Sequence, residues 1–337
     1  MAYATAPPKT PWVRVAAVVA VLTVIISVVL AAFAWPAARS SVHDVPIVVA
    51  GPPGASDQVI ATLQRRLPGA FDISRVADTA AASRAIHDRI AYGAIDVSTG
   101  RPSVLVASAA SPVVAQALET VATALTSGST SAASVRDLAA LKADDPRGAG
   151  HAAGAMPLVI GGMLAAVLLT GRVRGAVRRL TGALVFSLTG GLAMAAILQF
   201  WLGSLGGDYW ANAGVVALSV AATSVTILGL EALLGAVGFG LGATVMVLVG
   251  NPLSGMTSAP EMLPGWSGRL GQFLPPGAAG WLLRSTAFFD GHGAFRPIVV
   301  LTAWLIAGAV LAAVGSARTS RRVPADVGAR PPVAAAA

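Results

Sequence analysis

The chain has 337 residues, of which 55% are hydrophobic and only 11% are charged. Ordinary soluble domains carry roughly 25% charged residues, so this deficit points to long segments buried in lipid. The sequence has no cysteine, which excludes disulfides, thiolate catalysis, zinc–thiolate sites and iron–sulfur clusters.

The N-terminal region predicts a cytoplasmic leader over residues 1–11 and a first transmembrane helix over residues 12–35. The apolar run has the length of about 20 residues that crosses a bilayer. Trp12 and Trp35 lie where interfacial aromatic residues are expected. The alternative is a cleaved signal peptide, because Ala32-Phe33-Ala34 is similar to a cleavage site.

Residues 36–152 alternate strand-like and helix-like patterns and therefore predict one extracytoplasmic α/β domain. Strands are expected at residues 45–50, 71–76, 93–97 and 103–107. Helices are expected to begin at the N-cap residues Ser56, Asp78 and Ser111. Residues 127–134 predict a flexible segment, and residues 135–142 predict one more helix.

Residues 153–316 predict a bundle of five further transmembrane helices. The fold class is therefore an integral membrane, α-helical bundle of about six transmembrane helices, with the α/β domain between spans one and two. The five spans are expected at about 154–170, 180–203, 211–230, 234–250 and 297–316. Gly238 and Gly242 form a small-xxx-small pair, which predicts close helix packing. Residues 317–337 predict a disordered cytoplasmic tail.

The basic residues predict the orientation. With the N-terminus inside, the cytoplasmic segments carry ten Lys and Arg residues and two acids, Glu231 and Asp326, so they hold the whole formal charge of +8. Such an asymmetry follows the positive-inside rule. We therefore expect a multi-pass protein of the plasma membrane with both termini cytoplasmic, in contact with membrane lipid and without a nucleic-acid partner. Glu231, at a short inner turn, is expected to be solvated.

The loop over residues 171–179 is short and basic. Its arginines are Arg172, Arg174, Arg178 and Arg179. They either determine topology or form a docking surface for a cytoplasmic partner.

Residues 251–293 are too rich in Gly and Pro for a transmembrane helix and too apolar for an ordinary loop. Because prolines break helices, we expect short half-helices that cap the outer face of the bundle, either as a gate or vestibule or as a structural lid. The candidate cap or gate residues are Asn251, Pro252, Ser254, Gly255, Pro260, Glu261, Pro264, Pro275, Pro276 and Arg284. Glu261 and Arg284 are expected to pair or to line a vestibule.

No catalytic, cofactor or metal site is predicted. The four histidines, His43, His87, His151 and His292, are scattered without metal-ligand spacing. Ser254 lacks the glycine pattern of a nucleophile elbow, and the chain contains no phosphate-binding loop motif. We therefore expect a protein that is not an enzyme.

The layout of one span, an outer domain and five further spans resembles the type-2 ABC exporter permeases, particularly the phage-infection-protein-like branch. The local likeness lies in Asn251-Pro252-Leu253-Ser254-Gly255, the segment 260–264, Leu274-Pro275-Pro276 before Arg284, and Tyr92-Gly93-Ala94-Ile95.

The resemblance implies a permease subunit that forms a homo- or heterodimer and exports a hydrophobic or polymeric substrate. A separate cytoplasmic ATPase would power it and would contact the loop over residues 171–180. The alternative is a non-transporting cell-envelope membrane protein whose extracytoplasmic domain binds or scaffolds a partner.

Overall fold

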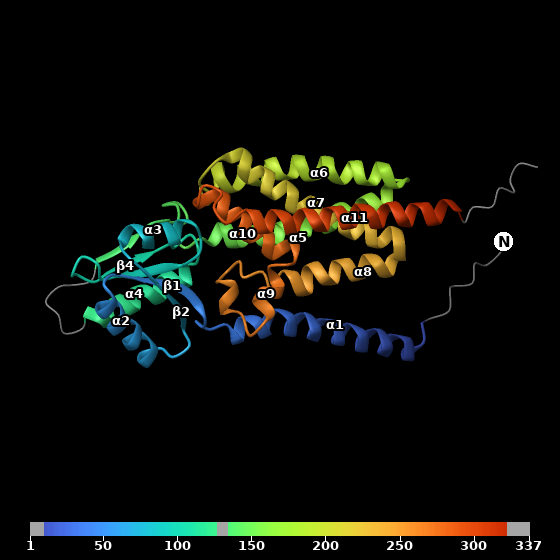
Figure 1. Ribbon diagram of the computed structural model, residues 1–337. Coiled ribbons are helices and arrows are strands. Elements are labelled where there is room, and N and C mark those ends of the chain that lie inside the picture. Colours follow the sequence, from blue (N-terminus) through green and yellow to red (C-terminus); the bar gives the residue numbers. More distant parts are fainter. Residues whose placement is uncertain (1–9, 127–133, 322–337) are drawn as a thin grey trace, which may run out of the picture.

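The computed structural model describes residues 10–126 and 134–321. A small α/β unit lies at one end of a group of long helices (Figure 1). Residues 1–9 of the expected leader, the segment 127–133 and residues 322–337 of the expected tail lie outside the described residues. The expectation of disorder is wrong for residues 317–321, which continue the last long helix.

Among the described residues, five helices are long and apolar enough to cross a membrane. They are α1 (Trp12–Arg39), α5 (Ala149–Arg172), α6 (Ala176–Ala196) with its π-helical continuation η1 (Ile197–Trp201), α7 (Tyr209–Leu234) and α11 (Phe295–Arg321). Their length and composition indicate a membrane protein.

The segment expected as a further span is shorter than these five helices. It consists of α8 (Ala236–Thr244) and the π-helix η2 (Val245–Gly250). A helix rises about 1.5 Å per residue, so this segment reaches roughly 22 Å, less than the hydrocarbon thickness of about 30 Å.

Helix α7 forms the centre of the bundle. It contacts α5, α6, α8, α10 (Pro275–Phe288) and α11. Glycines allow the closest approaches: a Cβ atom at Gly308 of α11 would lie 2.6 Å from the Cα atom of Thr226. Similarly, a Cβ atom at Gly238 would clash with the carbonyl oxygen of Leu230. Gly238 and Gly242 therefore pack α8 against α7 of the same chain.

The α/β unit, which we call the sheet unit, contains five strands in the order β2-β1-β3-β4-β5. The strands are β1 (Val45–Ala50), β2 (Phe71–Val76), β3 (Gly93–Asp96), β4 (Ser103–Val106) and β5 (Ser134–Asp137). β1 lies parallel to β2 and β3, β4 is antiparallel to β3, and β5 is parallel to β4. The helices are α2 (Pro53–Arg66), α3 (Thr79–His87) and α4 (Pro112–Thr126).

Two local expectations for the sheet unit are wrong. Residues 135–142 do not form a helix, because residues 134–137 form the edge strand β5. Helix α2 begins at Pro53 rather than after Ser56, since proline suits the first helical turn. The Ser56 hydroxyl instead donates to the carbonyl oxygen of Gly51 at 3.1 Å. Asp78 does cap α3, accepting from the Ala81 amide at 2.7 Å.

Candidate functional site

Residues 251–293, which we call the cap, pack against both the sheet unit and the long helices. The cap contains the short helix η3 (Pro260–Met262), α9 (Ser267–Gly271) and α10. Most of its apolar side chains are buried, although Trp266 and Phe273 are 70% and 54% exposed. The cap is therefore a packed element with two aromatic side chains left at its surface.

The cap completes the core of the sheet unit. Ala259, Met262 and Phe289 belong to the same buried apolar cluster as the central strands, and Phe289 is fully buried. The Ser41 amide, just before β1, donates to the carbonyl oxygen of Met262 at 3.1 Å. The cap and the sheet unit thus share one hydrophobic core.

Arg89 joins the sheet unit to α10. It lies in the turn after α3 with a positive φ of 60°. Its Nη1 donates to the Trp281 carbonyl at 2.7 Å and to the Ser285 hydroxyl at 2.6 Å. The guanidinium carbon also lies 3.8 Å from the centre of the Trp281 ring, a cation–π contact. Burial is the main reason why the pKa of Arg89 is lowered to about 9.

Tyr92 makes a second polar link, three residues further along the chain. Its hydroxyl donates to Glu261 Oε2 at 2.8 Å. Burial raises the pKa of Tyr92 well above its ordinary value, and the charge of Glu261 raises it further. Glu261 is therefore held by the sheet unit.

Arg284 is almost fully buried and has different partners. Its guanidinium donates to the backbone carbonyls of Gly255 and Met256, so it holds the turn at the start of the cap. The expected pairing between Glu261 and Arg284 is therefore not formed. Pro275 and Pro276 begin α10 and are buried, and the Pro264 carbonyl accepts from the Ser267 hydroxyl at 2.7 Å.

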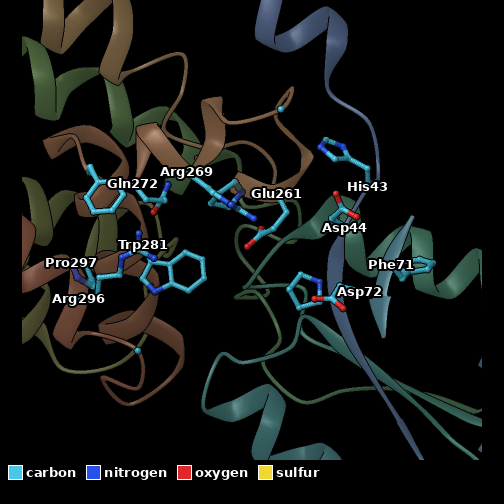
Figure 2. Close-up of a pocket in the computed structure, with 15 residues that line it drawn as sticks. His43, Asp44, Phe71, Asp72, Glu261, Arg269, Gln272, Trp281, Arg296 and Pro297 are labelled. Atoms are coloured by element: carbon cyan, nitrogen blue, oxygen red, sulfur yellow. The ribbon is translucent and has the colours of Figure 1, made fainter. Parts of the chain in front are cut away.

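A cavity of about 930 Å³ opens at the junction of the sheet unit, the cap and α11 (Figure 2). Asp44 and Asp72 lie on the sheet side, whereas Arg269 and Arg296 lie on the side of the long helices. Other lining residues are His43, Phe71, Pro260, Glu261, Gln272, Phe273 and Trp281. The sheet side of the cavity therefore carries two acidic groups, the side of the cap and α11 carries Arg269, Arg296 and the acid Glu261, and aromatic side chains also line the space.

The remaining candidate gate residues line a separate cavity. Asn251, Pro252, Ser254 and Gly255 border a space of about 400 Å³ that also touches Phe33 of α1 and Met156 of α5. The structure thus divides the expected gate: its first residues face α1, and Pro260 and Glu261 face the larger cavity.

The basic loop lies at the end of the bundle away from the sheet unit (Figure 1). Arg172, Arg174 and Arg178 are exposed. Arg179 has a different role: it donates to the Val173 carbonyl at 2.8 Å and to Glu231 at 3.1 Å. The expectation that Glu231 is simply solvated is wrong, because its side chain is only 17% exposed and pairs with Arg179. Both residues line a cavity of about 550 Å³.

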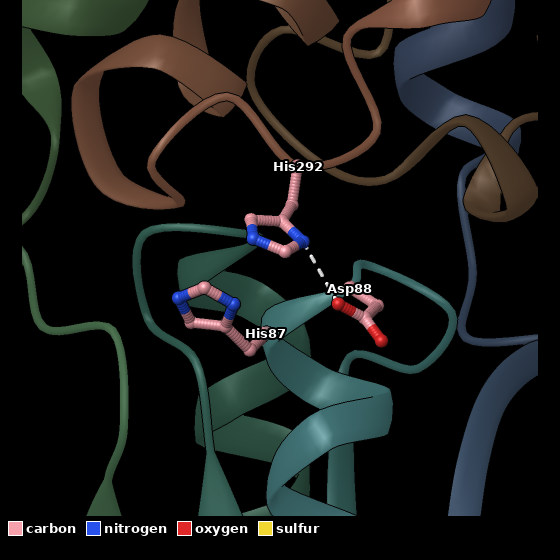
Figure 3. A group of neighbouring side chains, drawn as sticks. All are labelled: His87, Asp88 and His292. Atoms are coloured by element: carbon pink, nitrogen blue, oxygen red, sulfur yellow. Dashed lines mark ion pairs between the residues drawn. The ribbon is translucent and has the colours of Figure 1, made fainter.

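Two of the scattered histidines come together in space. His87, at the end of α3, and His292, in the turn before α11, have ring centres 4.3 Å apart (Figure 3). His292 Nδ1 lies 2.8 Å from Asp88 Oδ1. Sequence spacing could not reveal this cluster, because 205 positions separate the two histidines. The same holds for Arg89 and Trp281, which are 192 positions apart.

Comparisons with known protein families, curated proteins and solved structures return no match.

Proposed function

We propose that this chain is the membrane permease subunit of an ABC-type exporter, powered by a separate cytoplasmic ATPase. The observation that carries the proposal is the 930 Å³ cavity between the sheet unit and the long helices. Pockets of roughly 300–1,000 Å³ suit small molecules or one segment of a larger one. In this proposal the cavity is the outer vestibule of the export path, in the plasma membrane, with both termini in the cytoplasm.

The cavity's charges favour a particular substrate class. Arg269 and Arg296 would attract an anionic group, and Asp44 and Asp72 would attract a cationic group on the opposite wall. The Arg296 guanidinium lies 4.9 Å from the centre of the Phe273 ring, so apolar surface adjoins this basic group. An amphipathic molecule that carries both charges fits this combination.

The exposed arginines supply the ATPase side of the proposal. Arg172, Arg174 and Arg178 lie on the loop that the positive-inside rule assigns to the cytoplasm. Arg179 forms an ion pair with Glu231 and donates to the Val173 carbonyl, so it stabilises the conformation of the loop. Docking would therefore depend on the three exposed arginines.

Copurification with measurement of ATP hydrolysis tests the proposal. The tagged chain would be purified in mild detergent from the membranes of its native cell, and phosphate release from ATP would be measured. We expect an ATP-hydrolysing partner with the unmodified chain. Replacing Arg172, Arg174 and Arg178 with Gln should lower its recovery by about tenfold, since several interfacial charges are lost.

A matched control removes three positive charges from the sheet unit, at the opposite end of the molecule. Arg65, Arg66 and Arg101 are exposed residues of the sheet unit, and their replacement with Gln should leave ATP hydrolysis unchanged. The exporter proposal fails if the unmodified chain brings no ATP hydrolysis, or if both triple variants behave alike.

A cell-envelope protein that binds or scaffolds a partner without transport is the second candidate. The buried central helix α7 favours it, because α7 fills the middle of the bundle with side chains. Because α7 occupies the middle of the bundle, an exporter would need its path along the bundle surface, between this chain and a second permease subunit. Absence of ATP hydrolysis from the native complex would favour this second candidate.

A further inference from the structure

A group of imidazole and carboxylate side chains lies where the sheet unit meets the turn between α10 and α11 (Figure 3). One ligand atom from each of His87, Asp88 and His292 lies within 4.8 Å of the others. Asp290 adds a second carboxylate, with Oδ2 at 3.4 Å from His87 Nε2. All of these side chains reach solvent, with side-chain exposures between 44% and 85%.

Hydrogen bonding alone does not account for the position of His87. Its contact of 3.4 Å with Asp290 exceeds the usual hydrogen-bond range of about 2.7–3.2 Å. Its ring instead faces the edge of the His292 ring. Two imidazole rings therefore lie against each other beside the carboxylates of Asp88 and Asp290.

We propose that His87, Asp88 and His292 bind a divalent transition-metal ion of the Zn²⁺ class. Imidazole nitrogen and carboxylate oxygen are ordinary ligands of Zn²⁺. A dication would balance the two carboxylates and would be shared by both neutral rings. Asp290 or a water molecule would complete the coordination.

The geometry needs only small side-chain movements. Ligands about 2.1 Å from Zn²⁺ in a tetrahedron lie roughly 3.4 Å from one another. Atoms now up to 4.8 Å apart must therefore approach by up to about 1.4 Å, whereas His292 Nδ1 and Asp88 Oδ1, now 2.8 Å apart, must separate slightly. The exposed rings have room to rotate. Because His87 and Asp88 come from the sheet unit and His292 comes from the cap, the ion would clamp the two parts together.

Co²⁺ binding to the full chain provides the main test. The chain would be purified in detergent with a tag that contains no histidine, freed of metal by chelation and titrated with Co²⁺. We expect one equivalent to bind with the strong visible absorption of low-coordinate Co²⁺, and Zn²⁺ to displace it. The His87→Gln/His292→Gln variant should bind at least about 100-fold more weakly, since it lacks two ligands.

His43→Gln is the matched control, because His43 lines the large cavity and lies outside the cluster. This variant should bind Co²⁺ like the unmodified chain.

A second measurement needs no variant. Zn²⁺ should protect His87 and His292, but not His43, from diethylpyrocarbonate modification mapped by mass spectrometry. Equal Co²⁺ affinity in the double variant and the unmodified chain, or a lack of protection by Zn²⁺, would overturn the proposal.

Discussion

Arg89 and Tyr92 lie in the loop that joins α3 to β3, and each places a polar group against the cap. Arg89 holds α10 through Trp281 and Ser285, whereas Tyr92 holds η3 through Glu261. A buried donor that loses its acceptor costs about 1–3 kcal/mol. Both side chains therefore fix the position of the sheet unit on the cap.

A double-mutant cycle between Tyr92→Phe and Glu261→Leu should measure this link, because leucine has no acceptor for the Tyr92 hydroxyl. We expect a coupling free energy of about 1–3 kcal/mol at neutral pH, because the phenol donates to a charged carboxylate. The readout is the free energy of unfolding of the purified chain in detergent. Additive effects of the two substitutions would show that the hydrogen bond does not contribute.

The pKa of Tyr92 sets the pH dependence of the same link. Since the pKa is raised in the folded chain, the stabilising contribution is complete below the unfolded pKa of about 10. It is lost as the pH rises from about 10 to the higher folded pKa, because in this interval the unfolded chain is deprotonated whereas the folded chain keeps the proton. The stability difference between the unmodified chain and Tyr92→Phe should therefore shrink above pH ~10.

Residue-level contacts of this kind are only partly visible in the sequence. The segment 251–293 could be predicted as a packed cap, since its apolar residues and prolines are contiguous. The partners of its charged residues could not be predicted, because Glu261 bonds to a tyrosine 169 positions away. Such pairings follow from how the sheet unit sits on the bundle, which no local pattern encodes.

At the scale of elements, the loop between α5 and α6 contains neighbouring arginines with different roles. The Arg179 guanidinium donates to two backbone carbonyls at the end of α5, those of Thr170 and Val173. It also donates to the Glu231 carboxylate on α7. These carbonyls have no helical partner of their own at a helix C-terminus. Arg178 points to solvent.

Arg179→Gln should destabilise the bundle by about 1–3 kcal/mol, because it breaks a partly buried ion pair and two hydrogen bonds. Arg178→Gln should change stability by less than about 0.5 kcal/mol, as exposed substitutions usually do. Thermal unfolding of both variants in detergent distinguishes the two effects. Equal losses would show that the contacts of Arg179 do not stabilise the loop.

The strands illustrate which elements the sequence can specify. β1 and β2 occupy the expected residues, because each is a run of six residues bounded by turn signals or a helix cap. β5 was expected as part of a helix. It has only four residues, all exposed, and its strand conformation depends on parallel pairing with β4, a non-local contact.

At the scale of the whole molecule, the sheet unit and the basic loop lie at opposite ends of the bundle (Figure 1). If the long helices cross the membrane, these two parts face different compartments. Because the chain has no cysteine, single cysteines can report the orientation without background.

A membrane-impermeant maleimide should label Thr99→Cys in intact cells, and Val177→Cys only after permeabilisation. Thr99 lies in the exposed turn between β3 and β4, and Val177, at the start of α6, is 77% exposed. The physical reason is the excess of arginine at the Val177 end. Labelling of Val177→Cys but not Thr99→Cys in intact cells would reverse the proposed orientation.

The shared core of the sheet unit and the cap has a consequence for biosynthesis. Phe289 is synthesised roughly 150 residues after the last strand of the sheet unit, and chains grow at about 5–20 residues per second. For on the order of ten seconds, while α5 to α10 are synthesised, the core of the sheet unit therefore lacks the apolar side chains that the cap contributes. Its strands emerge first, but it can reach its final fold only after nearly the whole bundle has been inserted, so a chaperone that shields this apolar surface would act in that interval.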